Sequence, residues 1–236
     1  MSLPLFLVPS LPPGPEFRLD GPEGHHAATV QRLGVGAQLL LGDGRGGLAS
    51  ATVVAAGRGV LDLAVGERRL VPPPVPRVVV AQALAKGDRA ELAVQAMTEV
   101  GVDAIVPWTA ARCVARWRDD KPLQRWRATA REAAKQSRRA WVPPVAAPAT
   151  TAEVAARAGV VLVLHEEAGT GLSTVDIPDA GEITLVVGPE GGVAPEELAA
   201  FEAAGATAVR LGDAVLRTST AGVAALAVLA VRLGRW

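Results

Sequence analysis

Three loops of the 236-residue chain carry residue types that could bind a small molecule and act on it. They span residues 164–167, 188–192 and 212–217, and each follows a short apolar run typical of a buried strand. Because ligands of open α/β sheets bind at the carboxyl ends of the strands, the loops are expected to meet at one edge. The middle loop, Gly-Pro-Glu-Gly-Gly, is the most unusual. Its glycine pair permits positive φ and close backbone approach to a ligand, and a simple turn would not need Glu190.

The motifs of the common cofactor classes are absent. No G-x-G-x-x-G follows a predicted strand and no G-x-x-x-x-G-K-[ST] occurs, which argues against dinucleotide and nucleoside-triphosphate sites. Cys113 and three histidines are too few for a thiolate or imidazole zinc site, so no metal is expected. The longest apolar run, residues 221–231, is too short to span a bilayer. We therefore expect a reduced, cytoplasmic, metal-free protein.

A basic segment is hidden by the formal net charge of zero. Residues 112–139 contain ten basic and three acidic side chains, whereas residues 150–207 contain ten acids and one base. Such a segment is a plausible footprint for a nucleic-acid phosphate backbone. A solvated helix face explains the charges equally well, and the charges alone do not separate the two interpretations.

The elements that must position these loops form two predicted domains. Residues 1–71 contain short alternating runs at 38–41, 48–55 and 60–65 with glycine turns between them, and one helix over about 23–33. This pattern predicts a small, mostly β domain. The proline-rich stretch 71–76 cannot supply the hydrogen bonds of a central strand, which predicts a boundary there.

Beyond the boundary, apolar runs alternate with helical segments. Strands are predicted at 78–83, 104–106, 160–164, 183–187 and 208–211. Helices are predicted to begin near Asp88, Pro122, Thr151, Pro195 and Thr220, the first with an Asp-x-x-Glu relative of a capping box. Alternation of this kind predicts an α/β domain with a mainly parallel sheet over residues 72–236.

Several of these motifs together resemble those of a known family. They are Leu185-Val-Val-Gly-Pro-Glu-Gly-Gly, then Pro195-Glu-Glu, then Val209-Arg-Leu-Gly-Asp-Ala-Val-Leu-Arg-Thr-Ser-Thr-Ala. Upstream matches begin at Lys86, Thr98 and Lys135, and the small domain matches through His26, Gln31-Arg32 and Asp43-Gly44. In this order and spacing they resemble the SPOUT methyltransferases, and within them the RsmE family, which methylates N3 of a uridine in 16S ribosomal RNA.

The resemblance implies a fold and a cofactor. Residues 1–71 would form a PUA-like RNA-binding β-barrel, and residues 72–236 a SPOUT α/β domain with a deep trefoil knot. The knot loops would hold S-adenosylmethionine through Leu164, His165, Glu166, Gly188, Pro189, Glu190, Gly191, Gly192, Leu211, Gly212, Val215, Leu216, Thr220 and Ala221. The implied partners are 16S ribosomal RNA or the small ribosomal subunit, and a second copy of the chain. The apolar stripe Val223, Leu226, Val228 and Leu229 is a candidate dimer surface, although a core helix would show the same stripe.

The implied chemistry singles out two polar residues. Uridine N3 must lose an imide proton, after which charge spreads onto the uracil oxygens, and Arg217 is the candidate to stabilise it. Glu190 is a candidate proton acceptor, but an ordinary carboxylate is a weak base for an imide, and bracing the loop through backbone N–H groups is slightly favoured. The candidate RNA contacts are His26, Arg32, Arg112, Arg116, Arg125, Arg131, Arg138 and Arg139.

Two positions depart from the family pattern, and two other functions stay open. Ser219 stands where the family usually has Glu, and Ala96 where it has Lys, so no role of either family residue transfers. The shared cofactor loops also suit 2′-O-ribose methylation of RNA. A non-enzymatic RNA-binding protein of ribosome assembly could use the barrel and the basic segment alone.

Overall fold

The computed structural model describes residues 3–85 and 87–236, and these divide into two compact units. The first unit runs to Pro73 and includes Ala134–Val142; the second comprises Pro74–Ala133 and Pro143–Trp236. Lys86, which opens one of the family motifs, lies outside the described residues. No helix in the described ranges is long and apolar enough to cross a membrane.

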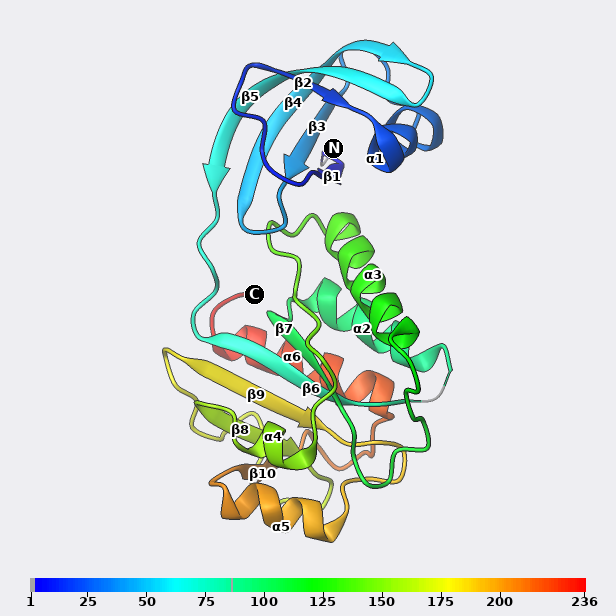
Figure 1. The fold of residues 1–236 in the computed structure, drawn as a ribbon. Coiled ribbons are helices and arrows are strands. Elements are labelled where there is room, and N and C mark those ends of the chain that lie inside the picture. The colour runs from blue at the N-terminus through cyan, green and yellow to red at the C-terminus, as the bar shows by residue number, and fades with distance from the viewer. Residues whose placement is uncertain (1–2, 86) are drawn as a thin grey trace. The chain divides into compact units, whose positions relative to one another are not determined.

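The first unit is built on one five-stranded sheet (Figure 1). Its strands are β1 (Leu5–Leu7), β2 (Glu16–Leu19), β3 (Gln38–Gly42), β4 (Gly47–Gly57) and β5 (Val60–Leu70), in the order β1-β3-β4-β5-β2. Only β1 and β3 pair in parallel; the other pairs are antiparallel. The predicted helix is a short α1 (Gly21–His25) continued by a π-helical turn (His26–Val30).

The segment Ala134–Val142 completes the first unit although it follows the stretch Pro74–Ala133 of the second. The Gly46 N–H donates to the Ala140 carbonyl (3.0 Å), and Trp141 Nε1 donates to the Val71 carbonyl (3.0 Å). Ala140 is buried in a cluster with Leu5, Leu7 and Leu48. This part of the unit was not predicted, because the family motif at Lys135 was assigned to the α/β domain.

A fully parallel sheet forms the second unit. Its strands are β6 (Arg77–Ala83), β7 (Ala104–Trp108), β8 (Val160–Leu164), β9 (Glu182–Val187) and β10 (Thr207–Val209), in the order β10-β8-β9-β6-β7. All five predicted strands are present, with ends that differ by at most two residues. The central strands are nearly continuous apolar runs because both faces of the sheet are covered.

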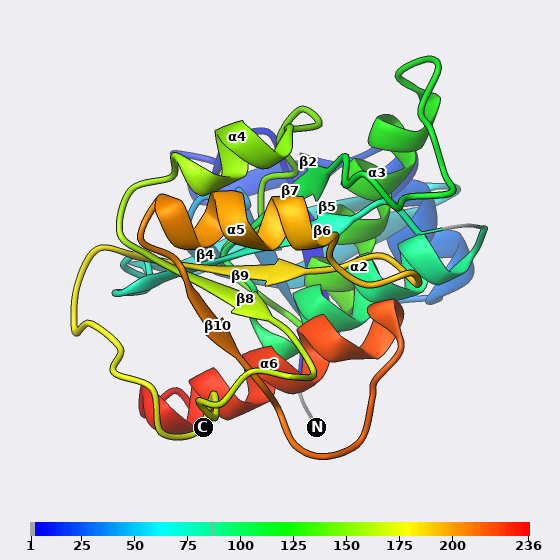
Figure 2. The same cartoon turned by 90° about the horizontal axis from the view of Figure 1, so that it is seen from below.

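Helices cover the two faces of this sheet. The second unit holds α2 (Arg89–Val100), α4 (Thr151–Ala155), α5 (Pro195–Ala203) and α6 (Thr218–Arg232), and α3 (Lys121–Gln136) begins in it. Figure 2 shows α4 and α5 on one face and α2 and α6 on the other. Leu226 and Leu229 of α6 are buried in this core, and Val223 and Val228 pack against it. The candidate dimer stripe is therefore mainly a core stripe.

The capping prediction for α2 was wrong. Asp88 has helical φ and ψ and makes no side-chain capping hydrogen bond. A capping box instead opens α4, where the Thr150 hydroxyl accepts from Glu153 N–H and the Glu153 carboxylate accepts from Thr150 N–H (2.7 Å). The hydrogen bonds that the Glu153 carboxylate accepts from the Thr150 N–H and hydroxyl lower the pKa of Glu153.

Candidate functional site

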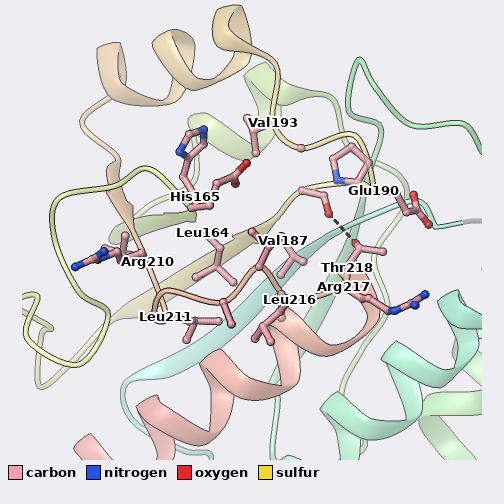
Figure 3. A pocket seen from close by; sticks show the side chains of 18 of the residues that line it. Leu164, His165, Val187, Glu190, Val193, Arg210, Leu211, Leu216, Arg217 and Thr218 are labelled. Carbon is pink, nitrogen blue, oxygen red and sulfur yellow. Dashed lines mark hydrogen bonds between the residues drawn. The ribbon is translucent and has the colours of Figure 1, made fainter.

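The three loops meet in one pocket of the second unit, at the carboxyl ends of β8, β9 and β10 (Figure 3). The cavity has a volume of about 400 Å³, within the usual range for small-molecule sites. Its floor is apolar, with Leu164, Val187 and Leu211, while Arg210 and Arg217 lie at opposite ends of it in Figure 3. The sequence therefore brings the loops together as the strand-end rule predicted.

Backbone geometry explains the glycines of the middle loop only in part. Gly192 has φ +71° and its N–H donates to the Pro189 carbonyl (2.9 Å), a turn that a β-branched residue resists. A Cβ on Gly188 would lie 3.0 Å from Val193 Cγ2. Gly191 is different, since its φ lies outside the left-handed region and a Cβ there would make only ordinary contacts with Arg112. The expectation of positive φ thus holds for Gly192 and not for Gly191.

The third loop presents a free guanidinium. Arg210 Nη1 donates to Asp213 Oδ1 (3.2 Å). Asp213, the nearby acid that could have paired with Arg217, is therefore bound to Arg210 instead. Arg217 is exposed, and within the described residues it has no side-chain hydrogen bond or ion pair. Val215 and Leu216 beside it are 78 % and 41 % exposed, so this part of the pocket offers apolar surface next to a cation.

Glu190 does not brace its loop, contrary to the favoured expectation. Its carboxylate is exposed and has no hydrogen-bond partner among the residues that the structure describes. The buried carboxylate near this loop is Glu197, which is 8 % exposed and binds groups outside residues 188–192. Glu197 Oε1 accepts from Ala111 N–H (2.8 Å) and the Thr151 hydroxyl (2.7 Å), and Oε2 accepts from Ala194 N–H (3.3 Å). Glu190 is thus left available to a ligand.

Most of the predicted cofactor residues line the pocket, and seven further residues do so as well. Those that line it as expected are Leu164, His165, Glu166, Gly188, Pro189, Glu190, Gly192, Leu211, Gly212, Val215, Leu216 and Ala221. Gly191 and Thr220 do not line it. The additional lining residues are Arg89, Val187, Val193, Val209, Arg210, Ala214 and Thr218. Five of these adjoin predicted positions, whereas Arg89 comes from the start of α2, and no local signal marks it.

The candidate RNA residues are divided between the two units. His26, Arg32, Arg138 and Arg139 belong to the first unit, and Arg112, Arg116, Arg125 and Arg131 to the second. The His26 ring packs edge-on against Phe6, with ring centroids 6.1 Å apart. Arg112 Nη1 donates to the Gly191 carbonyl (2.9 Å), which ties the basic segment to the middle loop. Arg125 forms an exposed ion pair with Glu91 (3.5 Å).

The two positions that depart from the family pattern both lie on helices and are at least partly buried. Ser219 is buried at the start of α6, and Ala96 is half-buried on α2. Burial raises the pKa of the Cys113 thiol, which favours its neutral form. Among the described residues, no three His, Cys, Asp or Glu side chains group as metal ligands would.

Both parts of the chain match models of known protein families. Residues 72–230 match the family model of an RNA methyltransferase domain, and residues 19–65 that of an RNA methyltransferase PUA domain. A ribosomal RNA small subunit methyltransferase E from Mycobacterium tuberculosis is 53 % identical, over 98 % of this chain and 93 % of its own length. The Bacillus subtilis enzyme of that name is 30 % identical, over 91 % of this chain and 90 % of its own length.

Solved structures show the same fold over nearly the whole chain. A ribosomal RNA small subunit methyltransferase E from Neisseria gonorrhoeae, bound to S-adenosylmethionine, superposes with a TM-score of 0.87 at 28 % identity and covers 98 % of each chain. A methyltransferase from Legionella pneumophila with the same bound cofactor gives a TM-score of 0.86 at 27 % identity, again over 98 % of each chain.

Proposed function

Since the chain belongs to the ribosomal RNA small subunit methyltransferase E family, we propose that it transfers a methyl group from S-adenosylmethionine to uridine N3 in 16S ribosomal RNA. The observation that carries this proposal is the composition of the pocket. An apolar floor adjoins Glu190 and Arg217, two polar side chains without a partner among the described residues, where the three predicted cofactor loops meet. A carboxylate could accept the N3 proton and a guanidinium could stabilise the charge that develops on the uracil.

The residues of the pocket fit the proposed cofactor. Val187, Leu211 and Leu216 offer apolar surface for an adenine ring, and the glycines at 188 and 192 let backbone groups approach a ligand closely. The carboxylates of Glu166 and Glu190 supply negative charge for a sulfonium and an ammonium group. When bound, S-adenosylmethionine supplies an activated methyl group, so the protein has mainly to position the two reactants.

The chain's own groups would then orient and stabilise the base. The exposed Arg217 side chain is free to reach a uracil carbonyl, where charge develops as the N3 proton leaves. Glu190 is the proposed proton acceptor, because it is the unpaired carboxylate of the middle loop. Because Glu190 is exposed, this role also requires that bound RNA exclude water from its carboxylate.

We also propose the trefoil knot that the resemblance implied. The support is local: the loop after β8 runs beside the chain that leaves β10, with a parallel bridge between Gly171 and Arg210. Leu172 N–H donates to the Arg210 carbonyl (2.8 Å), and Arg210 N–H donates to the Thr170 carbonyl (2.9 Å). Arg232 Nη1 of α6 donates to the Leu172 carbonyl (2.9 Å), so α6 also holds this loop.

Dimerisation and a cytoplasmic site of action complete the proposal. Val231 of α6 is 64 % exposed beside the half-buried Val228, so a second copy of the chain could bury both. Light scattering across a concentration series tests the dimer.

Mapping the methylated nucleotide tests the proposed reaction. Purified protein and labelled S-adenosylmethionine are incubated with naked 16S ribosomal RNA and with small subunits, and the product nucleoside is identified by mass spectrometry. We expect 3-methyluridine, unchanged by a chelator. A 2′-O-methylated nucleoside would assign the alternative reaction. Absence of cofactor binding at high micromolar concentration would contradict the proposal that the protein is a methyltransferase.

A further inference from the structure

Gln82 is a polar side chain within an otherwise apolar stretch of β6. The neighbouring residues Val78, Val79, Val80, Ala81 and Ala83 are all buried, and Gln82 itself has no exposed surface. In the sheet, Gln82 pairs with Val187 of β9, the residue before Gly188. A buried polar group at this position, directly behind the cofactor loops, calls for an account of its hydrogen bonds.

The amide of Gln82 joins three elements. Its Nε2 donates to Thr218 Oγ1 (3.1 Å), with longer contacts to the carbonyls of Ala83 (3.2 Å) and Thr218 (3.4 Å). The Thr218 hydroxyl in turn donates to the Gly188 carbonyl at 2.6 Å, as the dashed line in Figure 3 shows. This chain of bonds, the Gln82–Thr218 bridge, connects β6 to the end of β9 and to the start of α6.

Stability alone does not explain the bridge. The Gln82 Oε1 atom is buried and has no hydrogen-bond partner within residues 3–85 and 87–236. A Cβ added to Gly222 of α6 would lie 3.4 Å from this oxygen and 2.9 Å from Met97 Sδ, so the surroundings are closely packed. A buried amide oxygen without a partner disfavours folding, and an apolar side chain of similar volume would avoid that cost.

The two ends of the bridge lie next to the two proposed catalytic residues. Gly188 precedes Glu190 by two positions, and Thr218 directly follows Arg217. The Arg217 carbonyl is also held, by the N–H groups of Thr220 and Ala221 (2.9 Å each). We propose that Gln82 and Thr218 are positioning residues that fix the separation of the Glu190 and Arg217 loops, and this proposal rests on the proposed function.

Three variants test the bridge without removing a proposed catalytic group. Thr218→Val keeps the shape of the side chain but loses the hydroxyl, and we expect the single-turnover methylation rate to fall about tenfold, the equivalent of one hydrogen bond. Thr218→Ser restores the hydroxyl and should recover the rate to within about threefold. Gln82→Met should lower the rate while leaving the unfolding temperature unchanged or higher, because it removes the unpaired oxygen.

A double variant and a matched control separate positioning from general stability. Because both residues act through one chain of bonds, Gln82→Met with Thr218→Val should be no slower than the slower single variant by more than about twofold. Thr184 of β9 is fully buried, and its hydroxyl bonds Arg157 and Glu182, which do not line the pocket. Thr184→Val should lower the unfolding temperature and leave the rate unchanged.

Failure of the bridge differs from failure of the proposed reaction. Rates that fall only in step with the unfolding temperature, or multiplicative losses in the double variant, would overturn the bridge while wild-type methylation stands. If the wild-type protein methylates no RNA, the proposed reaction fails and calorimetry with S-adenosylhomocysteine still decides the bridge. About tenfold weaker binding by Thr218→Val with recovery by Thr218→Ser supports it, and equal affinities refute it.

Discussion

Arg217 leaves the third loop one residue before the buried Thr218, with a fixed backbone and an unpaired guanidinium. If it stabilises charge on the uracil carbonyls, Arg217→Ala should cost about 3 kcal/mol in the chemical step, as for loss of one preorganised donor. Arg217→Lys should recover only part of the rate, because a point charge cannot reproduce the planar fork.

Single-turnover methylation with saturating RNA and cofactor separates this chemical effect from binding. Cofactor affinity and the unfolding temperature should change little, since the side chain is exposed and makes no contact that the folded unit needs. A wild-type rate in Arg217→Ala would remove the residue from the mechanism, and loss of folding would show a structural role.

A second prediction concerns Gly192 and cofactor binding. Gly192→Val should weaken S-adenosylmethionine binding by at least tenfold, because its φ of +71° resists a β-branched residue and the loop must shift. Gly205 has φ +89° in the turn before β10 and does not line the pocket, so Gly205→Val is a control with similar strain. Calorimetry on both variants measures the difference, and equal affinities would show that the loop does not cradle the cofactor.

For single residues, the sequence predicts those whose role depends on their neighbours in the chain. The glycine loop and Arg217 lie in contiguous motifs, so their placement in the pocket follows from the strands before them. Glu197, Gln82 and Thr218 act through partners as far as 136 positions away in the chain. No local pattern contains such a partner, and only the folded structure showed that Glu197 holds the start of α5 against α4 and the chain after β7.

Among the elements, α5 depends on the Glu197 carboxylate. Its three hydrogen bonds join the start of α5 to the start of α4 and to the chain after β7. Glu197→Ala should lower the free energy of unfolding by about 3 kcal/mol, because two N–H groups and a hydroxyl lose a charged acceptor. Glu197→Gln keeps one oxygen and should cost about 1 kcal/mol. Urea denaturation measures both, and equal losses would contradict the bonding scheme.

The basic segment carries a prediction about RNA. Arg116 and Arg125 are exposed, and Arg125 would exchange its ion pair with Glu91 for a phosphate contact. Neutralising one true contact, as in Arg116→Gln or Arg125→Gln, should reduce the magnitude of the log affinity against log salt slope by roughly 0.7 to 0.9. Arg77→Gln is the control, since Arg77 is an ion-paired surface arginine outside the segment. Unchanged slopes would show that these arginines do not contact RNA and belong to an ordinary solvated helix face.

The elements themselves were largely predictable in the second unit and less so in the first. Long apolar runs with helices between them identify β6 to β10 because both faces of that sheet are buried. The strands β1 and β2 have only three and four residues and lie at the two edges of their sheet, close to prolines. Edge strands tolerate nearby proline, and three or four residues are too few to show an alternating pattern, although β1 is apolar and buried throughout.

For the molecule as a whole, the first unit requires a segment from the middle of the chain. Trp141 is half-buried and bonds the Val71 carbonyl, and a Cβ on Gly46 would lie 2.7 Å from its ring. Trp141→Ala should destabilise this unit by about 2 kcal/mol, less than a fully buried tryptophan would. Trp236 is 66 % exposed, and Trp236→Ala serves as the control.

Hydrogen exchange can assign that loss to one unit. In Trp141→Ala, amides of β3, β4 and β5 should exchange faster, while those of β6, β8 and β9 keep their protection. Uniform loss of protection in both sheets would show that the two units unfold as one, and no change would show that the segment is dispensable.

The interrupted first unit also has a consequence during protein synthesis. A ribosome that has made residues up to Pro73 must add about 70 more before Val142 is available, which takes roughly 4 to 14 s at ~5–20 residues per second. Until then the apolar side chains of Leu5, Leu7 and Leu48 lack their cover. The nascent N-terminal sheet is therefore incomplete and accessible to chaperones while much of the next unit is synthesised. Slow codons before residue 142 should prolong that exposure.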